Sequence, residues 1–262
     1  MPVFNERRFL PRSLRALASQ DTEFQLILVD NGSTDGSGLL AEQIIARLGI
    51  RGRVVFERTP GTVPALARGL AEADTELVAT CDADTFYPRA YLSTAERLFD
   101  ADAGACMASA YFLPPRVSAT RRLAAAMHQL TAAFVWPRQA HNGGAGQCFR
   151  TAALRGQGGY DTEVWPLVLA DHEIVHRMLK IGRQRWHRDL WCIPSDRRQD
   201  ADAVRWSLAE RLLYHATPFG LKNWYFYKFL SPRLMRRGLH STRLRERDWS
   251  EDGFYGLHTV RG

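Results

Sequence analysis

The sequence contains few cysteines and no long apolar run. The four cysteines are scattered and form no C-x-x-C pair; they are Cys81, Cys106, Cys148 and Cys192. This pattern argues against a zinc site or a disulfide framework and favours buried thiols in a reducing compartment. No apolar run approaches the roughly 20 residues that a membrane-spanning helix requires. Because the start MPVFNERRFL is charged from its sixth residue, no signal peptide is expected, and these absences together predict a cytoplasmic protein.

Internal repeats, low-complexity tracts and long linkers are also absent from the sequence. The 262 residues are 45% apolar and 24% charged, an ordinary globular composition that one continuous domain can accommodate. Predicted strands and helices alternate through the first part of the chain, which is typical of a parallel sheet covered by helices. The strands are expected at residues 24–30, 54–57, 76–82 and 105–113, and the helices at residues 38–48, 63–73 and 88–101, with Pro88 at the first position of the last helix.

The second half of the chain differs from the first in pattern and in charge. Residues 176–247 hold 17 Lys/Arg and 6 Asp/Glu, a net charge of +11, whereas residues 1–175 have a net charge of −2. Such a basic face could meet phosphates, an anionic membrane surface or nucleic acid. A solvated, arginine-rich surface is the alternative, and no RNA-binding signature accompanies the charge. The expected elements are helices over residues 119–136, 170–181 and most of 204–237, a glycine-rich stretch at 141–150, and extended chain at 183–194.

Carboxylates occur where the predicted strands end. Asp30 ends the strand of residues 24–30, Asp82 and Asp84 follow the apolar run LVAT, and Glu6 follows PVFN. Open α/β sheets bind ligands beyond the carboxyl ends of their strands, and alternation places Asp82 and Asp84 on the same side if the backbone stays extended. Two carboxylates so close repel each other unless a cation lies beside them. Mg²⁺ or Mn²⁺ suits this pair because substrate phosphates can complete the metal's shell of hard oxygen ligands; the alternative is that both aspartates only cap the loop.

Six segments of the sequence stand in a specific order and spacing. They are PVFNE (2–6), ILVDNGSTDGS (27–37), PGTVPALARGL (60–70), CDAD (81–84), GGAGQCFRTAALRGQGGYD (143–161) and ADHEIVHRMLKIG (170–182). Together they resemble the family 2 glycosyltransferases over nearly the whole chain. The resemblance implies an α/β fold of GT-A type, with a mostly parallel sheet flanked by helices. Within one domain it implies a Rossmann-like, nucleotide-sugar-binding half (1–115), an acceptor-binding α+β half (116–203) and a helical, basic C-terminal region (204–262).

The resemblance also assigns roles to individual residues at its matching positions. In the donor half it implies contacts to the nucleotide from Pro2, Val3, Phe4, Glu6, Asp30, Asn31, Gly32, Ser33 and Arg68, with Asp30 on the base. In the acidic segment it implies contacts to the ribose, the diphosphate and the metal from Asp82, Ala83 and Asp84, with Asp84 as the principal metal ligand and Asp82 beside it. In the acceptor half it implies that Asp171 is the general base.

The implied activity is that of an inverting, metal-dependent glycosyltransferase of polysaccharide biosynthesis. We expect it to move a sugar from a nucleotide-diphosphate sugar, a UDP-sugar foremost, to a hydroxyl acceptor such as a glycan or a lipid-linked saccharide, with Mn²⁺ or Mg²⁺ as cofactor. A divalent cation stabilises charge on the leaving diphosphate, and a base must take the proton of the acceptor hydroxyl. Asp171 begins a predicted helix, whose positive dipole end keeps a carboxylate ionised, although the same position also suits a helix N-cap.

Other functions stay open at this point. A nucleotidyltransferase of similar topology would need a glycine-rich phosphate loop with a basic residue after the first strand, and PVFNERRF lacks it. A catalytically inert binder of sugar nucleotides or nucleic acid would suit the basic charge. The aromatic stretch NWYFYKFL (223–230) and the basic residues after it either lie on an anionic membrane, at the inner face of the plasma membrane, or pack as a helix on the core.

The sequence departs from the family pattern in its acceptor half. The family's Glu-Asp pair is here Ala170-Asp171, and Glu173 either compensates in part or is an ordinary first-turn acid. Processive members carry Q-x-x-R-W, and the nearest segment here is DAVRW (202–206), which weakens a prediction of polymer synthesis.

A second set of open alternatives concerns the first strand and two loops. Family members have a whole apolar strand before PVFNE, and only Met1, Pro2 and Val3 correspond to it here, so we expect an apparently truncated first strand with less secure contacts to the base. His187 in RWHRD is either a further metal ligand or a structural partner, and the Gly143–Gly146 loop either admits an acceptor or makes a turn.

Overall fold

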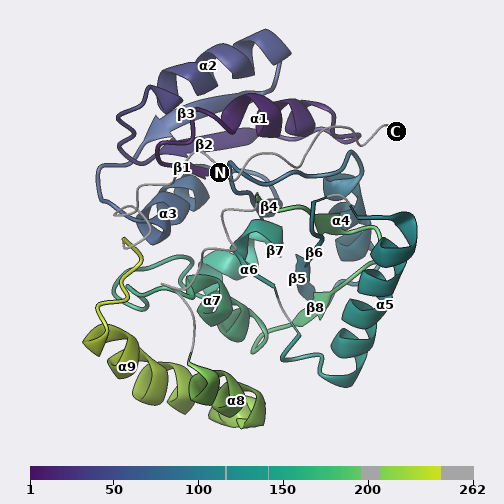
Figure 1. Ribbon diagram of the computed structural model, residues 1–262, viewed down its shortest axis with the longest axis vertical. Coiled ribbons are helices and arrows are strands. Elements are labelled where there is room, and N and C mark those ends of the chain that lie inside the picture. Colours follow the sequence, from purple (N-terminus) through teal and green to yellow (C-terminus); the bar gives the residue numbers. More distant parts are fainter. Residues whose placement is uncertain (116, 141, 196–206, 243–262) are drawn as a thin grey trace.

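The computed structural model describes residues 1–115, 117–140, 142–195 and 207–242 (Figure 1). The strands in these residues are β1 Pro2–Val3, β2 Leu26–Asp30, β3 Gly52–Phe56, β4 Leu77–Thr80, β5 Ala105–Ser109, β6 Tyr111–Phe112, β7 Gln147–Arg150, β8 Arg183–Arg185 and β9 Trp191–Cys192. The α-helices are α1 Leu10–Ala18, α2 Ser37–Leu48, α3 Thr62–Glu72, α4 Tyr91–Asp100, α5 Ala119–Val135, α6 Thr151–Gly156, α7 Ala170–Met178, α8 Leu208–Ala216 and α9 Ser231–Arg236. Two 3₁₀ turns and one π-helix complete them: η1 Gly144–Gly146, η3 Phe219–Leu221 and η4 Trp224–Leu230.

The described strands form two main sheets and a short pair. The first sheet has the order β1-β2-β3 and is parallel, the second has the order β4-β7-β5-β8, and β6 pairs with β9. In the second sheet β7 runs antiparallel to both of its neighbours, whereas β5 and β8 are parallel. The prediction of an α/β fold with a mostly parallel sheet flanked by helices is therefore confirmed.

Helices cover both faces of the first sheet. Figure 1 shows α1 and α2 on one face and α3 on the other, which is the arrangement that right-handed crossovers between parallel strands produce. Strand register aligns Val3 with Asp30 and Asp30 with Phe56, so the three carboxyl ends lie at one edge. This edge positions the donor half of the candidate site.

The expected short first strand is confirmed, since β1 has two residues and pairs with β2.

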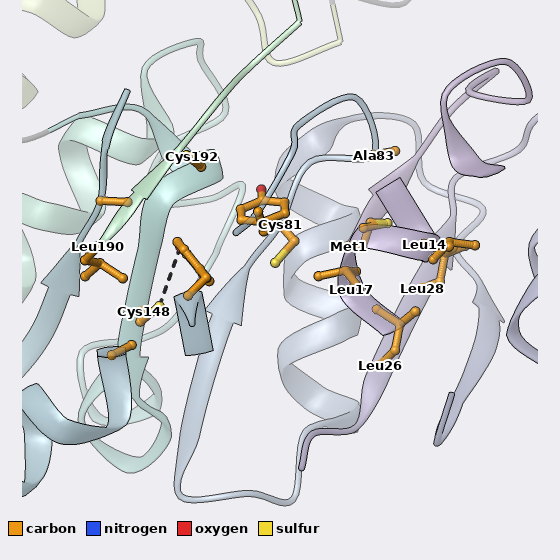
Figure 2. Close-up of a cluster of buried hydrophobic side chains, with 14 of the residues drawn as sticks. Met1, Leu14, Leu17, Leu26, Leu28, Cys81, Ala83, Cys148, Leu190 and Cys192 are labelled. Atoms are coloured by element: carbon orange, nitrogen blue, oxygen red, sulfur yellow. Dashed lines mark hydrogen bonds between the residues drawn. The ribbon is translucent and has the colours of Figure 1, made fainter. Parts of the chain in front are cut away.

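A cavity lies between the two main sheets, where β4 pairs only with β7 among the described strands. The cavity has a volume of about 440 Å³, and its lining includes Met1, Leu26, Leu77 and Tyr160. Figure 2 shows Met1 and Leu26 on one side of this region and Cys81, just after β4, on the other. The Met1 ammonium donates to the Ile27 carbonyl oxygen at 2.9 Å, and burial lowers its pKa.

The C-terminal helices pack on α7 at the end of the molecule opposite α2 (Figure 1). In the aromatic stretch, Tyr225 and Phe226 are fully buried, and the Trp165 ring meets Phe226 edge-on at 5.7 Å. Trp224, in contrast, is 48% exposed. The helix-packing alternative is therefore correct for the buried rings, and no described helix is long and apolar enough to cross a membrane. The segment 202–206 and the basic residues after 242 lie outside the described residues.

Several expected elements differ in detail from the structure. Pro88 is not in the helix, which begins at Tyr91; the Pro88 carbonyl oxygen instead accepts hydrogen bonds from Tyr91 N–H and Gln20 Nε2. The strand expected at 105–113 is split into β5 and β6. Strand β4 ends at Thr80, and the Thr85 N–H donates to the Asp82 carbonyl oxygen at 3.3 Å. The backbone thus turns at the two aspartates, so strand alternation does not set their sides.

Three elements were not predicted. Helix α1 buries Leu10, Leu14 and Leu17, whose i, i+4, i+7 spacing was a readable helical signal. Strand β7 forms the end of the glycine-rich stretch of residues 141–150, and helix α6 follows it directly. Strand β7 has only four residues, too few for periodicity to reveal it.

His176 on α7 gives the fold a predicted pH dependence. It is 4% exposed; Nε2 contacts Asn223 Oδ1 at 2.8 Å, and Nδ1 has no hydrogen-bond partner among the described residues. Burial, with Lys180, Lys222 and Arg177 nearby, lowers its pKa from 6.5 to about 4. Below pH 6.5 the unfolded chain therefore binds a proton that the folded chain does not. We expect the free energy of unfolding to fall by roughly 2–3 kcal/mol between about pH 6.5 and 4.

Urea unfolding at pH 7.5 and pH 5 measures this loss. The control is His176→Gln, which cannot be protonated, so its stability should depend less on pH than that of the wild type. Equal pH dependence in both proteins would show that His176 contributes nothing to it.

Candidate active site

The loops after β1 and β2 are tied together. Asp30 ends β2, and its Oδ1 accepts the Ser33 N–H at 2.9 Å across a turn in which Gly32 has φ 79°. The Asn5 N–H donates to Ser33 Oγ at 3.1 Å, and Asn5 Oδ1 accepts the Thr34 N–H at 2.8 Å. Asn5 itself has φ 56°, a conformation that asparagine tolerates better than most residues. The structure thus brings the segment of Pro2, Val3, Phe4 and Glu6 beside that of Asp30, Asn31, Gly32 and Ser33.

The Asn31 side chain binds the backbone of the loop between β3 and α3. This side chain is buried, and Nδ2 donates to the carbonyl oxygens of Glu57 and Thr59 at 3.0 and 2.8 Å. Its Oδ1 accepts the Gly61 N–H at 2.8 Å. Asn31 therefore shapes the donor edge by clamping the loop between β3 and α3.

Arg68 lies on α3, within the segment PGTVPALARGL (60–70). Its guanidinium pairs with Glu72, one turn further along the helix, at 2.8 Å, and Arg53 pairs with the same carboxylate at 2.8 Å. The Arg68 side chain is 42% exposed. A contact between Arg68 and a nucleotide stays a prediction. It requires the guanidinium either to leave Glu72 or to bind Glu72 and the nucleotide together.

The acidic turn after β4 contains Asp82, Ala83 and Asp84. Ala83 is buried, and the two aspartates are partly exposed. Asp84 Oδ2 accepts the hydroxyl of Ser195 at 2.6 Å. No local sequence signal marks Ser195, because it lies 111 residues away along the chain and only packing brings it to the turn.

The donor set of this turn fits a cation that substrate phosphates help to hold. Among the described residues no group of three His, Cys, Asp or Glu side chains could bind a metal alone. Mg²⁺ and Mn²⁺ sites at nucleotides use only one or two carboxylates, with phosphate oxygens and water as the other ligands. His187 Nδ1 lies 3.6 Å from Asp189 Oδ2, a contact that agrees with a structural partner, and a metal-ligand role for His187 stays a prediction.

The segment 142–147, named here the glycine loop, leads into β7 and contacts the start of α7. The Gly144 N–H donates to Asp171 Oδ2 at 3.1 Å, and Gln147 Nε2 donates to the Asp171 carbonyl oxygen at 3.2 Å. An added methyl group on Gly144 would lie 3.4 Å from Asp171 Cβ, so the loop backbone approaches the aspartate closely. The loop therefore makes a turn that positions Asp171.

Asp171 lies in the first turn of α7, which begins at Ala170 after Leu169 with φ 66°. Its Oδ1 accepts the His172 N–H at 3.0 Å and lies 3.0 Å from His172 Nδ1. The carboxylate is 24% exposed, so it is both held and accessible. Asp171 is thus not a simple N-cap, and its role as general base stays a prediction that this geometry supports.

Glu173 cannot take the place of the family's missing glutamate. Its side chain is 1% exposed and is bound by Arg177, with Nε at 2.8 Å from Oε1. The Tyr227 hydroxyl donates to the same carboxylate. Glu173 is therefore a structural residue that joins α7 to the C-terminal helices, and the idea that it compensates for Ala170 is wrong.

Comparison with known proteins identifies the family of the chain. The family model "Glycosyl transferase family 2" matches residues 1–155. The undecaprenyl-phosphate 4-deoxy-4-formamido-L-arabinose transferase of Proteus mirabilis is 33% identical over 100 residues, 34% of this chain and 28% of that protein. The dodecaprenyl-phosphate galacturonate synthase of Rhizobium johnstonii is 35% identical over 89 residues, 32% and 26% of the two chains. The matched stretch thus spans only about a quarter of these relatives.

Solved structures share the fold. The mannosyltransferase PcManGT from Pyrobaculum calidifontis, in complex with GDP-Man and Mn²⁺, superposes with a TM-score of 0.62 at 18% identity over 95% of this chain and 74% of that chain. S. aureus TarS 1-349 in complex with UDP-GlcNAc gives 0.59 at 18% identity over 87% and 70%. Since the family model covers more than half of the chain, the protein belongs to glycosyl transferase family 2.

Proposed function

We propose that this protein is a glycosyltransferase that inverts the anomeric centre as it moves a sugar from a UDP-sugar to the hydroxyl of a glycan or a lipid-linked saccharide, with a divalent cation as cofactor. The observation that carries the proposal is the hydrogen bond between Gly144 N–H and Asp171 Oδ2. It holds a partly exposed carboxylate on the glycine loop, which the Tyr87 hydroxyl also links to the acidic turn. A base and a diphosphate site held by one loop are what direct displacement of a sugar requires.

The donor would bind at the edge formed by the ends of β1, β2 and β4. Asp30 would face the base, and the loops of Pro2–Glu6 and Asp30–Ser33 would border the nucleoside. Asp84, with Asp82 beside it, would hold the cation, which stabilises negative charge on the leaving diphosphate. The solved structure with GDP-Man and Mn²⁺ supports such a pairing of nucleotide and metal on this fold.

On the acceptor side, Asp171 would remove the proton of the attacking hydroxyl. The first turn of α7 places the carboxylate near the positive end of the helix dipole, which favours a negative charge. Gly144 N–H and His172 N–H fix both carboxylate oxygens, so the base is oriented before the acceptor arrives. Attack from the face opposite the diphosphate inverts the configuration.

A polyprenyl phosphate is a second candidate acceptor. The names of the two curated relatives mention undecaprenyl phosphate and dodecaprenyl phosphate. A phosphate oxygen is already ionised near neutral pH, so this reaction would need no general base. The two acceptors therefore predict different sensitivities to the loss of Asp171.

The test is a turnover screen of purified full-length protein. Release of UDP or GDP is measured for a panel of sugar nucleotides with Mn²⁺, alone and with a glycan or a polyprenyl phosphate as acceptor. Metal-dependent turnover of one donor that a hydroxyl acceptor accelerates is expected. Binding of a donor without turnover would favour the inert binder. Release or consumption of pyrophosphate would favour a nucleotidyltransferase.

A lipid-linked acceptor would place the protein at an anionic membrane. The exposed Trp224 and Met235 lie near the exposed cations Lys228 and Arg236 on η4 and α9. Binding to anionic vesicles should therefore weaken with salt, because exposed charges are screened within about 8 Å at physiological ionic strength. Lys228→Gln/Arg236→Gln should reduce co-sedimentation severalfold at low salt.

The matched control for this membrane prediction removes two exposed cations from the other end of the molecule. Arg15→Gln/Arg47→Gln, on α1 and α2, changes the net charge equally and should co-sediment like the wild type. Equal loss in both double variants would mean that net charge alone attracts the vesicles. No sedimentation of the wild type at low salt would exclude the membrane face.

A further inference from the structure

Tyr87 connects the acidic turn to the glycine loop through its hydroxyl. The side chain is fully buried. The hydroxyl accepts the Asp82 N–H at 2.9 Å and donates to the Ala145 carbonyl oxygen at 2.8 Å. A tyrosine hydroxyl can donate and accept at once, and burial raises the pKa of this one well above 10, so it stays protonated at any working pH.

The glycine loop passes this constraint on to α7. The Ala145 carbonyl follows Gly144, whose N–H holds Asp171 Oδ2 at 3.1 Å. The Thr80 hydroxyl, at the end of β4, contacts the Gly144 carbonyl oxygen and lies 3.1 Å from that of Gln147. The loop is thus fixed to the acidic turn and β4 on one side and to Asp171 on the other.

We infer that Tyr87 is a positioning residue that sets the glycine loop, and through it the Asp171 carboxylate, relative to the acidic turn. The inference rests on the proposed function, in which Asp82 and Asp84 hold the donor diphosphate and Asp171 activates the acceptor. Tyr87 touches neither substrate. It keeps Asp82 in the acidic turn and the Asp171 carboxylate, which lie 89 residues apart in sequence, in a fixed relative position.

Loss of the hydroxyl would remove the partner of a partly buried N–H and of a buried carbonyl oxygen. The Asp82 N–H and the Ala145 carbonyl oxygen would then relax towards other partners, and the loop would shift against the turn. Misplacement of a reacting group by about 1 Å can cost on the order of 10²-fold in rate. We expect Tyr87→Phe to lower kcat for transfer by about tenfold or more, with KM for the donor changed less than about threefold.

Tyr91 offers a matched control. It is also fully buried, and its ring meets the Tyr87 ring edge-on at 4.8 Å. Its hydroxyl accepts a weak hydrogen bond from Cys148 Sγ at 3.7 Å. Within the part of the chain that the structure describes, it makes no hydrogen bond to the glycine loop. Tyr91→Phe thus removes a similar buried hydroxyl without releasing the loop, and we expect its kcat to stay within about twofold of wild type at a comparable loss of Tm.

The experiment uses the full chain below the Tm of each variant. Transfer and donor hydrolysis are measured with Mn²⁺, and hydrogen exchange of the Gly144 amide is followed by NMR. The expected result for Tyr87→Phe is slower transfer, a higher ratio of hydrolysis to transfer, and severalfold faster exchange at Gly144, none of which Tyr91→Phe shows. Thr80→Val, which releases the same loop from β4, should resemble Tyr87→Phe.

Two results would overturn the inference. One is wild-type kcat in Tyr87→Phe, and the other is an equal loss in Tyr87→Phe and Tyr91→Phe, which would mean that only stability changed. If wild-type protein turns over no donor, the proposed function fails, but exchange at Gly144 still reports the coupling. Unchanged exchange in both Tyr87→Phe and Thr80→Val would then refute the coupling by itself.

Discussion

Asp171→Asn is expected to reduce transfer to a hydroxyl acceptor by on the order of 10²-fold or more, the usual scale for a lost general base, with donor affinity almost unchanged. The amide keeps the shape of the side chain, and its single oxygen can still accept the Gly144 N–H, so the glycine loop should stay in place. The variant loses the ability to take a proton and the bond that the second oxygen accepts from the His172 N–H. The measurement is the transfer rate beside the donor dissociation constant for wild type and variant.

Two further variants make this result interpretable. Asp189→Asn changes a side chain that is 57% exposed and pairs with His187 and Arg188, and its activity should match the wild type. Glu173→Gln should change transfer far less per folded molecule, but it breaks a buried ion pair with Arg177 and should cost about 3–5 kcal/mol of stability. Transfer by this variant must therefore be measured at a temperature at which it is folded.

The acceptor class decides how a weak effect of Asp171→Asn is read. A large loss with a glycan acceptor and a small loss with a polyprenyl phosphate would identify two acceptors that differ in their need for a base. Little loss with every acceptor would contradict the assignment of Asp171. A greater loss in folded Glu173→Gln than in Asp171→Asn would move the base to the other face of α7.

Asp84→Ala is expected to abolish the enhancement of UDP binding by Mn²⁺. The ion is shared between this carboxylate and the diphosphate in the proposed site, so removing the carboxylate leaves the metal with phosphate and water alone. Titration of UDP with and without Mn²⁺ measures the enhancement directly. EDTA should reduce UDP binding by the wild type to the level of the variant.

Two controls separate loss of the metal from loss of the fold. Asp84→Asn keeps an oxygen for the Ser195 hydroxyl, which bonds the wild-type carboxylate at 2.6 Å, but lacks the charge, and it should also lose most of the enhancement. Asp21→Ala removes an exposed carboxylate before β2 and should bind like the wild type. Full enhancement in Asp84→Ala would mean that Asp84 is not a ligand.

Local sequence signals were sufficient for much of the donor half. The apolar runs before Asp30 and Asp82 predicted β2 and β4, and Gly49, with φ 64°, ends α2 where expected. These elements follow from short-range periodicity and turn residues. Helix α4 shows the limit of such signals, because it begins at Tyr91 and not at Pro88 as predicted. A proline can begin a helix, but here the Pro88 carbonyl oxygen accepts a hydrogen bond from the side-chain amide of Gln20, which follows α1.

Contacts between distant segments could not be predicted. Ser195 reaches Asp84 across 111 residues, and Tyr87 reaches Ala145 across 58. Neither serine nor tyrosine carries a local pattern that marks these contacts. The role of Glu173 was equally hidden, because first-turn glutamates are usually exposed and only the packing of η4 against α7 buries this one beside Arg177 and Tyr227.

The family, the α/β class and the acidic residues at the strand ends could be predicted from residue type, spacing and order along the chain. How those residues are held depends on the packing of the folded chain. This packing inserted β7 antiparallel between β4 and β5, turned the backbone at Asp82 and placed the glycine loop against Asp171. The physical reason is that burial and long-range hydrogen bonds are properties of the packed chain, and each such bond forms only where folding has already brought its two partners together.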